Sequence, residues 1–468
     1  MKEMENIPRD SNKKSNILVD DDEKEKNKNN IENISQNYIN PQDTKLTIQL
    51  KENPTEESDY LSQMFHKNFS INIIILLTLV ILIMLEFIYR RPLFTYSLTY
   101  EQNIQSNLSK NSFEFYKLVS ILGGGVLIGI CLIFVLFYYS LVKTIVLCVG
   151  IIFIVYIHDI MKLLYGDPRP FWINSILFQG NCETSYGNPS GHSLTAFFFF
   201  LSFCYYLTIF EKIRNNLTYK ISVYLTGIFL ACLTAYSRLA LGVHSLDQVL
   251  YGSALGIWFF VIFAYVFKIY NMPLSYYLKF YRNRKYFNIA IITLLTLFIL
   301  PIILYYLVDA EEDFKKYDLV MSKKCPNIEK YKFYNHNCMW ESLIILLICG
   351  MYLGQYLFWY LINSYNTNEN NKHVIENNIN YWNDYIKEIF SSFGNLIKAF
   401  ALLIITLLPG ILYFVVPGEN NSLRNIFIFK IGLPLFLIGF PAFGPCFYGF
   451  IYILKEQKSS FSKLSEEH

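Results

Sequence analysis

Apolar residues in this chain are grouped into long runs instead of alternating with polar ones. Several runs extend over about 20 residues, which is long enough for a helix to cross a hydrocarbon layer of about 30 Å. Together the runs predict about ten membrane-spanning helices, near residues 69–89, 116–139, 143–161, 191–210, 218–237, 247–270, 287–308, 341–363, 396–416 and 425–454. The chain is therefore predicted to be an all-α, polytopic membrane protein.

The residues before the first apolar run have a different character. Residues 1–66 are rich in Asn, Lys, Asp, Glu and Ser, and they include the charged run DDDEKEKNKNN at 20–30. Such a segment buries too little apolar surface to offset the entropy lost on ordering, so a disordered cytosolic tail is predicted. The motifs described below divide the remainder into a catalytic membrane domain at 67–271 and a C-terminal membrane extension of about four helices at 272–468.

Composition and charge agree with a membrane chain and exclude one class of partner. Of the 468 residues, 53% are hydrophobic and 18% are aromatic, and the formal net charge is only +3. No basic segment is interleaved with aromatic residues in the way that nucleic-acid binding requires. The expected surroundings are a lipid bilayer, and nucleic acid is not an expected partner.

Lys and Arg in the short loops predict the orientation in the membrane. Two loops on one predicted face carry basic residues: Lys212, Arg214, Lys220, Lys268, Lys279, Arg282, Arg284 and Lys285. This face is expected in the cytosol together with both termini, although Arg90 and Arg91 lie on the other side. Segments 162–190 and 237–246 then face the lumen or the cell exterior, in the endoplasmic reticulum, another endomembrane or the plasma membrane.

Modification sites in the outer loops are also predicted. The sequons at Asn107 and Asn420 fall on the outer face, where glycans are added. Three cysteines, Cys182, Cys325 and Cys338, lie in outer loops, where an oxidising compartment permits disulfides. Of these, Cys325 and Cys338 are predicted to pair.

Polar residues are concentrated in three short segments that all lie on the outer face. These segments are KLLYGDPRPFW at 162–172, NPSGHS at 188–193 and SRLALGVHSLDQ at 237–248. Because they share one side of the membrane, three loops can converge on one pocket. Asp167, in the first segment, is expected to be a loop charge that pairs with an arginine.

The residue types in these segments suit a bound phosphate. Lys162, Arg169 and Arg238 supply three cations, and the forked donors of a guanidinium match a tetrahedral oxyanion. Ser190 and Gly191 add a hydroxyl and closely approaching backbone N–H groups at the expected start of a helix. The pattern predicts a phosphate-binding pocket.

Two histidines in the same segments can supply the chemistry. One of His192 and His244 can attack phosphorus while the other protonates the leaving oxygen. A carboxylate or amide one turn beyond the attacking histidine would hold its other ring nitrogen and fix the tautomer.

The three segments together resemble the signature motifs of the type 2 phosphatidic acid phosphatase (PAP2) superfamily, over roughly residues 110–270. The matching patterns are Lys162-x6-Arg169-Pro170, Pro189-Ser190-Gly191-His192 and Ser237-Arg238-x5-His244. The resemblance implies a six-helix catalytic core in which His244 is the nucleophile that forms a phosphohistidine and His192 is the general acid and base. It further implies that neither a metal nor a cofactor is needed and that five residues bind the phosphoryl oxygens: Lys162, Arg169, Ser190, Gly191 and Arg238.

One position departs from the family pattern. The superfamily usually has an Asp four residues after the nucleophile, where this chain has Gln248, with Asp247 one residue earlier. Residues three and four positions along a helix both face the same turn, so either one can reach the imidazole. Gln248 is favoured as the residue that orients His244. A Gln there, the sequence RPFW and the CET of residues 182–184 are similar to the glucose-6-phosphatase branch.

The function expected from this resemblance is hydrolysis of a phosphomonoester. A bilayer setting favours a lipid phosphate, such as phosphatidic acid, lysophosphatidate or a sphingoid-base phosphate, entering sideways between helices. A sugar phosphatase of the glucose-6-phosphatase kind is the alternative. A non-catalytic transporter or scramblase that retains the fold is a further alternative, because it would explain the last four helices.

Overall fold

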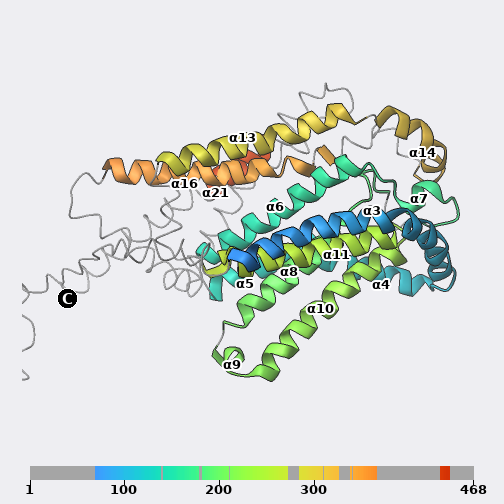
Figure 1. The fold of residues 1–468 in the computed structure, drawn as a ribbon, viewed down its shortest axis with the longest axis horizontal. Helices are drawn as coiled ribbons and strands as arrows, with labels where there is room; N and C mark the ends of the chain where they lie inside the picture. Colours follow the sequence, from blue (N-terminus) through green and yellow to red (C-terminus); the bar gives the residue numbers. More distant parts are fainter. Residues whose placement is uncertain are drawn as a thin grey trace, which may run out of the picture. The chain divides into compact units, whose positions relative to one another are not determined.

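The computed structural model describes residues 69–138, 141–178, 182–209, 211–271, 284–308, 310–325, 338–339, 341–365 and 433–442. Every regular element within these ranges is helical, so the all-α prediction is confirmed (Figure 1). The predicted tail at 1–66 and the expected span at 396–416 lie outside the described residues. Of the expected span at 425–454, only 433–442 is described.

The described helices follow one another in this order: α3 (Phe69–Ser106), α4 (Lys110–Ser120), η1 (Ile121–Gly123), α5 (Gly125–Tyr138), α6 (Leu141–Tyr165), α7 (Pro170–Ile173), α8 (Gly191–Leu207), α9 (Glu211–Arg214), α10 (Leu217–Ala240), α11 (Leu246–Val261), η2 (Ile262–Val266), η3 (Ile269–Asn271), α13 (Arg284–Leu307), α14 (Ala310–Lys324), α16 (Ile345–Tyr365) and α21 (Leu433–Ala442).

Five stretches of helix in the described ranges are long and apolar enough to cross a membrane. They are Ile73–Ser106, Lys143–Ile173, Leu217–Ala240, Leu246–Val266 and Arg284–Leu307. Two further apolar helices, Gly191–Leu207 and Ile345–Leu357, are shorter. A chain with several such helices is an integral membrane protein.

Helix α8 lies at the centre of the packed helices, where it contacts α6, α10 and α11. Its aromatic side chains form much of the core: Phe198, Phe199 and Tyr206 are fully buried. Aromatic side chains of this size bury a large area each, so α8 fixes the positions of the helices around it.

Two glycines on α11 bring that helix against the start of α8. A Cβ atom on Gly252 would lie 2.5 Å from the carbonyl oxygen of Ser190, and one on Gly256 would lie 2.4 Å from the carbonyl oxygen of Leu194. Only glycine permits two helix backbones to approach this closely, as is common between membrane helices. The beginning of α11 is thereby held beside the beginning of α8.

The span predicted at 116–139 is not one continuous helix, and this prediction was wrong. Helix α4 ends at Ser120, a 3-10 turn follows at Ile121–Gly123, and α5 begins at Gly125. The break coincides with three consecutive glycines, which favour a helix end. Packing selects this position, because a Cβ atom on Gly123 would lie 2.8 Å from the Thr234 side chain.

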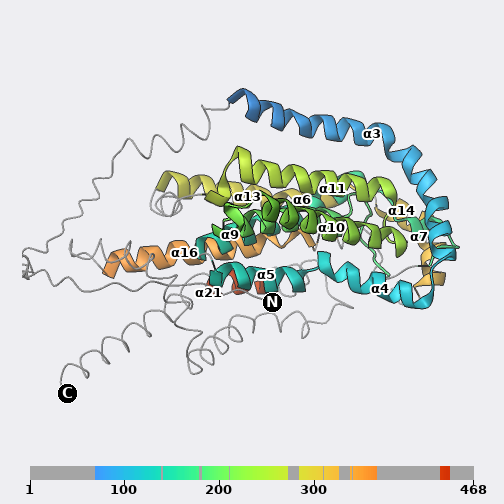
Figure 2. The ribbon, with the colours of Figure 1, turned by 90° about the horizontal axis from the view of Figure 1, so that it is seen from below.

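Helix α3 is longer than the predicted span at 69–89 and extends to Ser106. It contains Pro92, which removes a backbone hydrogen bond and bends a helix. Figure 2 shows α3 bending along its course, with its later part close to α7. The part of α3 before the bend packs against α11 and its π-helical continuation η2.

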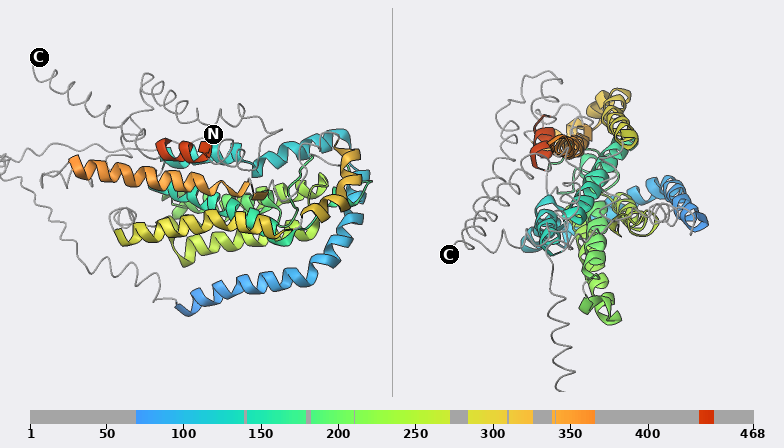
Figure 3. Two further views of the ribbon diagram at one scale, coloured as in Figure 1. Left: turned by 90° about the horizontal axis from the view of Figure 1, so that it is seen from above. Right: turned by 90° about the vertical axis from the view of Figure 1, so that its left-hand side faces the viewer.

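The described helices of the C-terminal extension pack against one another and against α6. Helix α13 contacts α6 and α16, and α16 contacts α21, as the views in Figure 3 show. Helix α14 instead packs on α7, beside the first of the three motifs. The extension therefore contacts the preceding helices at two places, along α6 and at α7.

The disulfide prediction was wrong. Cys325, at the end of α14, is bonded to Cys182 in the loop before α8, whereas Cys338 is a buried free thiol. Cys325 and Cys338 are closer in sequence, but a disulfide requires the two Cα atoms to lie within about 7 Å of each other. The packing of α14 on α7 brings Cys325 to Cys182, with 5.9 Å between their Cα atoms.

Candidate active site

The three motifs meet at one end of helices α6, α8, α10 and α11. Lys162 lies in the last turn of α6, Arg169 directly precedes α7, and Arg238 lies in the last turn of α10. All three cations are buried, with exposed fractions of 3%, 0% and 1% respectively. Charged side chains are almost never buried to this extent unless they are paired, so their partners define the site.

Arg169 joins the loop of the second motif to the loop of the third. Its Nε donates to the Ser185 carbonyl at 2.6 Å, and its Nη1 donates to the Val243 carbonyl at 3.0 Å. The same Nη1 lies 3.1 Å from Nε2 of His244. The Ser185 hydroxyl accepts from Arg169 Nη2 at 3.0 Å and from Lys162 Nζ at 3.1 Å. Two of the three predicted cations are thus fixed on one side of His244.

The surroundings of His244 determine its tautomer. Its Nδ1 lies 2.9 Å from the Gly187 carbonyl oxygen and 3.2 Å from Oε1 of Gln248. Both of these oxygens are acceptors, so Nδ1 carries the proton and Nε2 keeps its lone pair. That lone pair is directed at the guanidinium of Arg169.

The orientation of the Gln248 amide follows from its other partners. Its Nε2 donates to the Pro168 carbonyl at 2.9 Å, and its Oε1 accepts from the backbone N–H of Ser245 at 3.3 Å. A flipped amide would place its oxygen against the Pro168 carbonyl and its NH₂ group against the Ser245 N–H, so Oε1 points to the imidazole. Asp247 is buried, with 1% of its surface exposed, and its carboxylate makes no hydrogen bond to His244. Of the two candidates, only Gln248 contacts the histidine.

The second motif forms the beginning of α8. Ser190 is the residue before the first turn, and its hydroxyl accepts from the hydroxyl of Ser193 at 3.0 Å. The Ser190 N–H donates to the Gln248 carbonyl at 3.0 Å, which ties α8 to α11. Gly191 and His192 are the first two residues of α8, where free backbone N–H groups favour an anion.

Sequence reasoning did not assign a role to Glu183 or Ser120, both of which contact Arg238. The carboxylate of Glu183 bridges the two guanidiniums: Oε2 lies 2.8 Å from Arg169 Nη2, and Oε1 lies 2.9 Å from Arg238 Nη2. Ser120 accepts a hydrogen bond from Nη1 of Arg238. Glu183 belongs to the CET sequence noted above, whereas Ser120 fell within a predicted span and gave no signal.

A further group of charges lies next to Lys162. The Nζ atom of Lys162 lies 3.8 Å from Oδ1 of Asp159 and 3.5 Å from Oε2 of Glu341, which lies in the C-terminal extension four residues before α16. Nδ1 of His158 lies 2.8 Å from the same Asp159 oxygen. On the other side of the motif, Asp167 pairs with Arg90 at 3.2 Å, which confirms the expected pairing with an arginine. The extension therefore places a carboxylate against one of the three predicted phosphate-binding cations.

The electrostatics of the pocket keep His244 neutral. Burial, together with the positive charges of Arg169 and Arg238, holds the pKa of His244 well below its ordinary value. Burial would raise the pKa of the Glu183 carboxyl, but the positive charges of Arg169 and Arg238 hold it well below its usual range. The pocket therefore contains an unprotonated imidazole and an ionised carboxylate at neutral pH.

The described motifs coincide with a known sequence family. The family model of the PAP2 superfamily matches residues 143–272, which contain all three motifs. This segment belongs to the PAP2 superfamily. The chain is also 34% identical over 139 residues to dolichyldiphosphatase 1 of Dictyostelium discoideum, an alignment that covers 28% of this chain and 58% of that protein. The PAP2 segment thus spans little more than half the length of this curated relative.

A solved structure of the superfamily is also similar to this chain. It is the crystal structure of a transmembrane PAP2-type phosphatidylglycerolphosphate phosphatase from Bacillus subtilis, at 21% sequence identity and a TM-score of 0.35. The match covers 40% of this chain and 92% of the bacterial one.

Proposed function

We propose that this protein is a membrane phosphatase that hydrolyses a phosphorylated lipid through a phosphohistidine intermediate. The observation that carries this proposal is the environment of His244. Its Nδ1 faces two oxygens, so Nε2 carries the lone pair that a nucleophile needs, and this lone pair lies 3.1 Å from the buried guanidinium of Arg169, one of the proposed phosphate ligands.

In the first step, Nε2 of His244 attacks phosphorus, a nitrogen–phosphorus bond forms, and the bond from phosphorus to the leaving oxygen breaks. Lys162, Arg169 and Arg238 stabilise the negative charge of the phosphoryl oxygens in the transition state. His192 gives its proton to the leaving oxygen, so the alcohol departs neutral.

In the second step, His192 takes a proton from a water molecule, which attacks the phosphohistidine. The nitrogen–phosphorus bond breaks, inorganic phosphate is released, and His244 returns to its starting form. The Gly187 carbonyl and Gln248 stabilise the positive charge that His244 carries while it is phosphorylated.

Three cations in the pocket can perform the electrostatic work that a divalent metal performs in other phosphatases. We therefore infer that turnover does not need a metal ion.

A lipid substrate is supported by the membrane setting and by the name of the relative from Dictyostelium discoideum, which denotes action on dolichyl diphosphate. The substrate would be a phosphatidic acid, a lysophosphatidate, a sphingoid-base phosphate or a phosphorylated polyisoprenoid. A sugar phosphate is the second candidate, because the residue that contacts Nδ1 is Gln248, as in the glucose-6-phosphatase branch.

The test is phosphate release by the purified chain in lipid nanodiscs. The panel contains phosphatidic acid, sphingosine phosphate, dolichyl diphosphate and glucose 6-phosphate, with the His244→Ala variant as the matched control. We expect release from at least one lipid and no release by the variant. Release from glucose 6-phosphate alone would replace the lipid proposal by the sugar one. No release from any substrate would favour a transporter or scramblase.

A further inference from the structure

Glu183 bridges two of the arginines that are proposed to bind the substrate phosphate. Its two carboxylate oxygens accept from Arg169 and Arg238 at 2.8 and 2.9 Å, the two-pronged arrangement that these arginines would use for a phosphate. Arg169, one of the two arginines that Glu183 bridges, also lies 3.1 Å from Nε2 of His244, so the carboxylate and the proposed nucleophile share a neighbour.

The arginines and the carboxylate differ in their access to solvent. The side chains of Arg169 and Arg238 are 0% and 1% exposed, whereas the side chain of Glu183 is 28% exposed. Glu183 is therefore the most solvent-accessible member of this group of three charges.

The charges at this position favour exchange for a stronger anion. One carboxylate neutralises only one of the two guanidiniums that it bridges, whereas a phosphate monoester carries up to two negative charges near neutral pH. In a buried setting the unbalanced positive charge strengthens binding of the dianion. A phosphate can thus displace Glu183, and the carboxylate competes with it.

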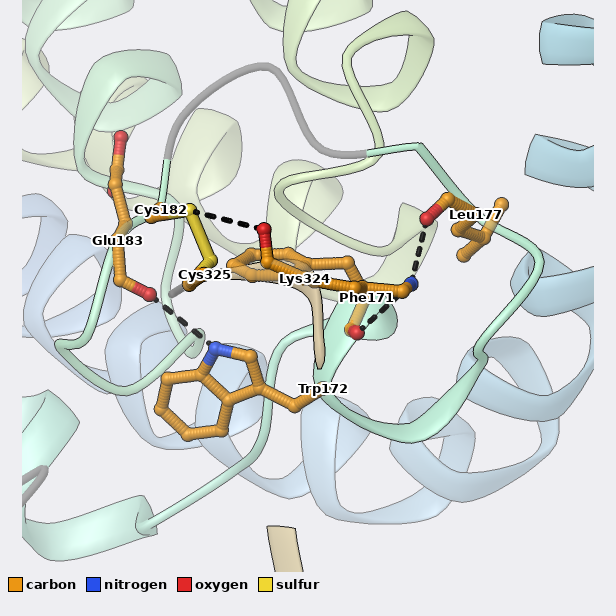
Figure 4. The surroundings of a disulfide bond; sticks show 7 residues. All are labelled: Phe171, Trp172, Leu177, Cys182, Glu183, Lys324 and Cys325. Carbon is orange, nitrogen blue, oxygen red and sulfur yellow. Dashed lines mark hydrogen bonds between the residues drawn. A yellow bond between two sulfur atoms is a disulfide. The ribbon is translucent and has the colours of Figure 1, made fainter. Parts of the chain in front are cut away.

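The C-terminal extension is bonded to the residue next to Glu183, as Figure 4 shows. Cys182 forms a disulfide with Cys325 at the end of α14, and the Glu183 carbonyl accepts from Nε1 of Trp172 at 3.2 Å. Lys324, next to Cys325, donates to the carbonyls of Phe171 and Leu177 at 3.2 and 2.6 Å. The end of α14 is thus tied to Cys182 and to the backbone of Phe171 and Leu177.

We propose that Glu183 is an internal competitor of the substrate phosphate, kept in the pocket by the disulfide to α14. This inference rests on the proposed function in that it takes Arg169 and Arg238 as phosphate ligands. In this inference Glu183 lowers the affinity of the site for the phosphoryl group. The C-terminal extension, through its disulfide to Cys182, helps to keep Glu183 in that position.

The test compares product inhibition by inorganic phosphate in the wild type and in Glu183→Gln, which keeps the size of the side chain and removes its charge. If the pocket is open about a tenth of the time, removing the competitor should tighten the inhibition constant by about tenfold. Glu114→Gln is the matched control, because Glu114 is exposed and pairs only with Lys117 among the described residues. The control should leave the constant unchanged.

A purely structural role for Glu183 predicts the opposite result. In that case Glu183→Gln would bind phosphate equally well or more weakly, because the two arginines would lose their arrangement, and the inference would be overturned. If Glu183→Gln does not fold, Glu183→Asp is measured instead. Its side chain is one methylene too short to bridge both guanidiniums, so a smaller tightening is expected, and weaker binding would again refute the idea.

The role of the disulfide is tested with the double variant Cys182→Ser/Cys325→Ser. We expect it to tighten phosphate inhibition in the wild-type background and to add nothing in the Glu183→Gln background. An equal effect in both backgrounds would overturn the link between the disulfide and Glu183.

Inhibition by vanadate distinguishes failure of this inference from failure of the proposed function. If it inhibits the wild type while Glu183→Gln shows no tightening, only this inference fails. If neither phosphate nor vanadate binds to either protein, the proposed function fails with it.

Discussion

The contact between Gln248 and His244 gives a prediction whose size can be worked out from the structure. Gln248→Ala removes the acceptor that lies 3.2 Å from Nδ1 of His244. The Gly187 carbonyl, at the shorter distance of 2.9 Å, remains. The tautomer of the imidazole is therefore expected to survive, and the loss is limited to one of two hydrogen bonds.

The magnitude follows from the energy of one such bond. A hydrogen bond contributes about 0.5–1.5 kcal/mol net, and the bond to a histidine that becomes positively charged lies toward the upper end. Losing about 1.4 kcal/mol of transition-state stabilisation slows turnover about tenfold. Gln248 also takes part in the capping box of α11 with Ser245, so the variant should lose about 1 kcal/mol of stability in addition.

The assay is kcat at saturating substrate, with folding checked by thermal unfolding, and Asp247→Asn as the matched variant. Asp247 lies next to Gln248 on α11 but makes no hydrogen bond to His244, so its replacement should change kcat by less than about threefold. The reverse ranking, a large loss in Asp247→Asn and none in Gln248→Ala, would refute the reasoning. Negligible effects of both would mean that Gly187 alone orients the histidine.

Three further predictions concern the same site. His244→Ala should abolish both turnover and labelling by a radioactive phosphoryl donor. His192→Ala should still accumulate some labelled protein, because formation of the phosphohistidine is slowed without being abolished and its breakdown is slowed as well. Equal labelling of His244→Ala and wild type would exclude the phosphohistidine. Vanadate should inhibit tightly because it imitates the trigonal-bipyramidal transition state. EDTA should leave activity unchanged. Activity that disappears in EDTA and returns with Mg²⁺ would contradict the role given to the three cations. The pKa of His244 is held well below its ordinary value, so the imidazole is already unprotonated at pH 6.5 and protonates only when the pH falls through the lowered value. The acid limb of kcat/KM should therefore lie well below pH 6.5. Gln248→Glu puts a negative charge beside Nδ1, so this variant should move the acid limb toward neutral pH.

Much of the candidate site follows from short stretches of sequence. The spacing from Lys162 to Arg169 and from Arg238 to His244 is fixed by the chain itself, and the long apolar runs place both pairs at helix ends on one face of the membrane. Motif residues at helix ends can meet without detailed knowledge of the packing. For this reason the convergence of the three motifs was predictable, as was the all-α membrane fold.

Contacts between distant segments were decided only by the tertiary structure. The helix break at Gly123 depends on Thr234 of α10, and the disulfide partner of Cys325 depends on how α14 packs. Sequence spacing allowed both Asp247 and Gln248 to face His244. In the folded chain Gln248, whose amide donates to the Pro168 carbonyl, makes the hydrogen bond to the imidazole, and Asp247 does not. Glu183 was visible in the sequence as a loop carboxylate, but its position between two arginines requires the packing of three separate loops. Periodicity and motif spacing are local properties that a chain carries in any conformation, whereas partners for buried charges exist only once the helices have packed.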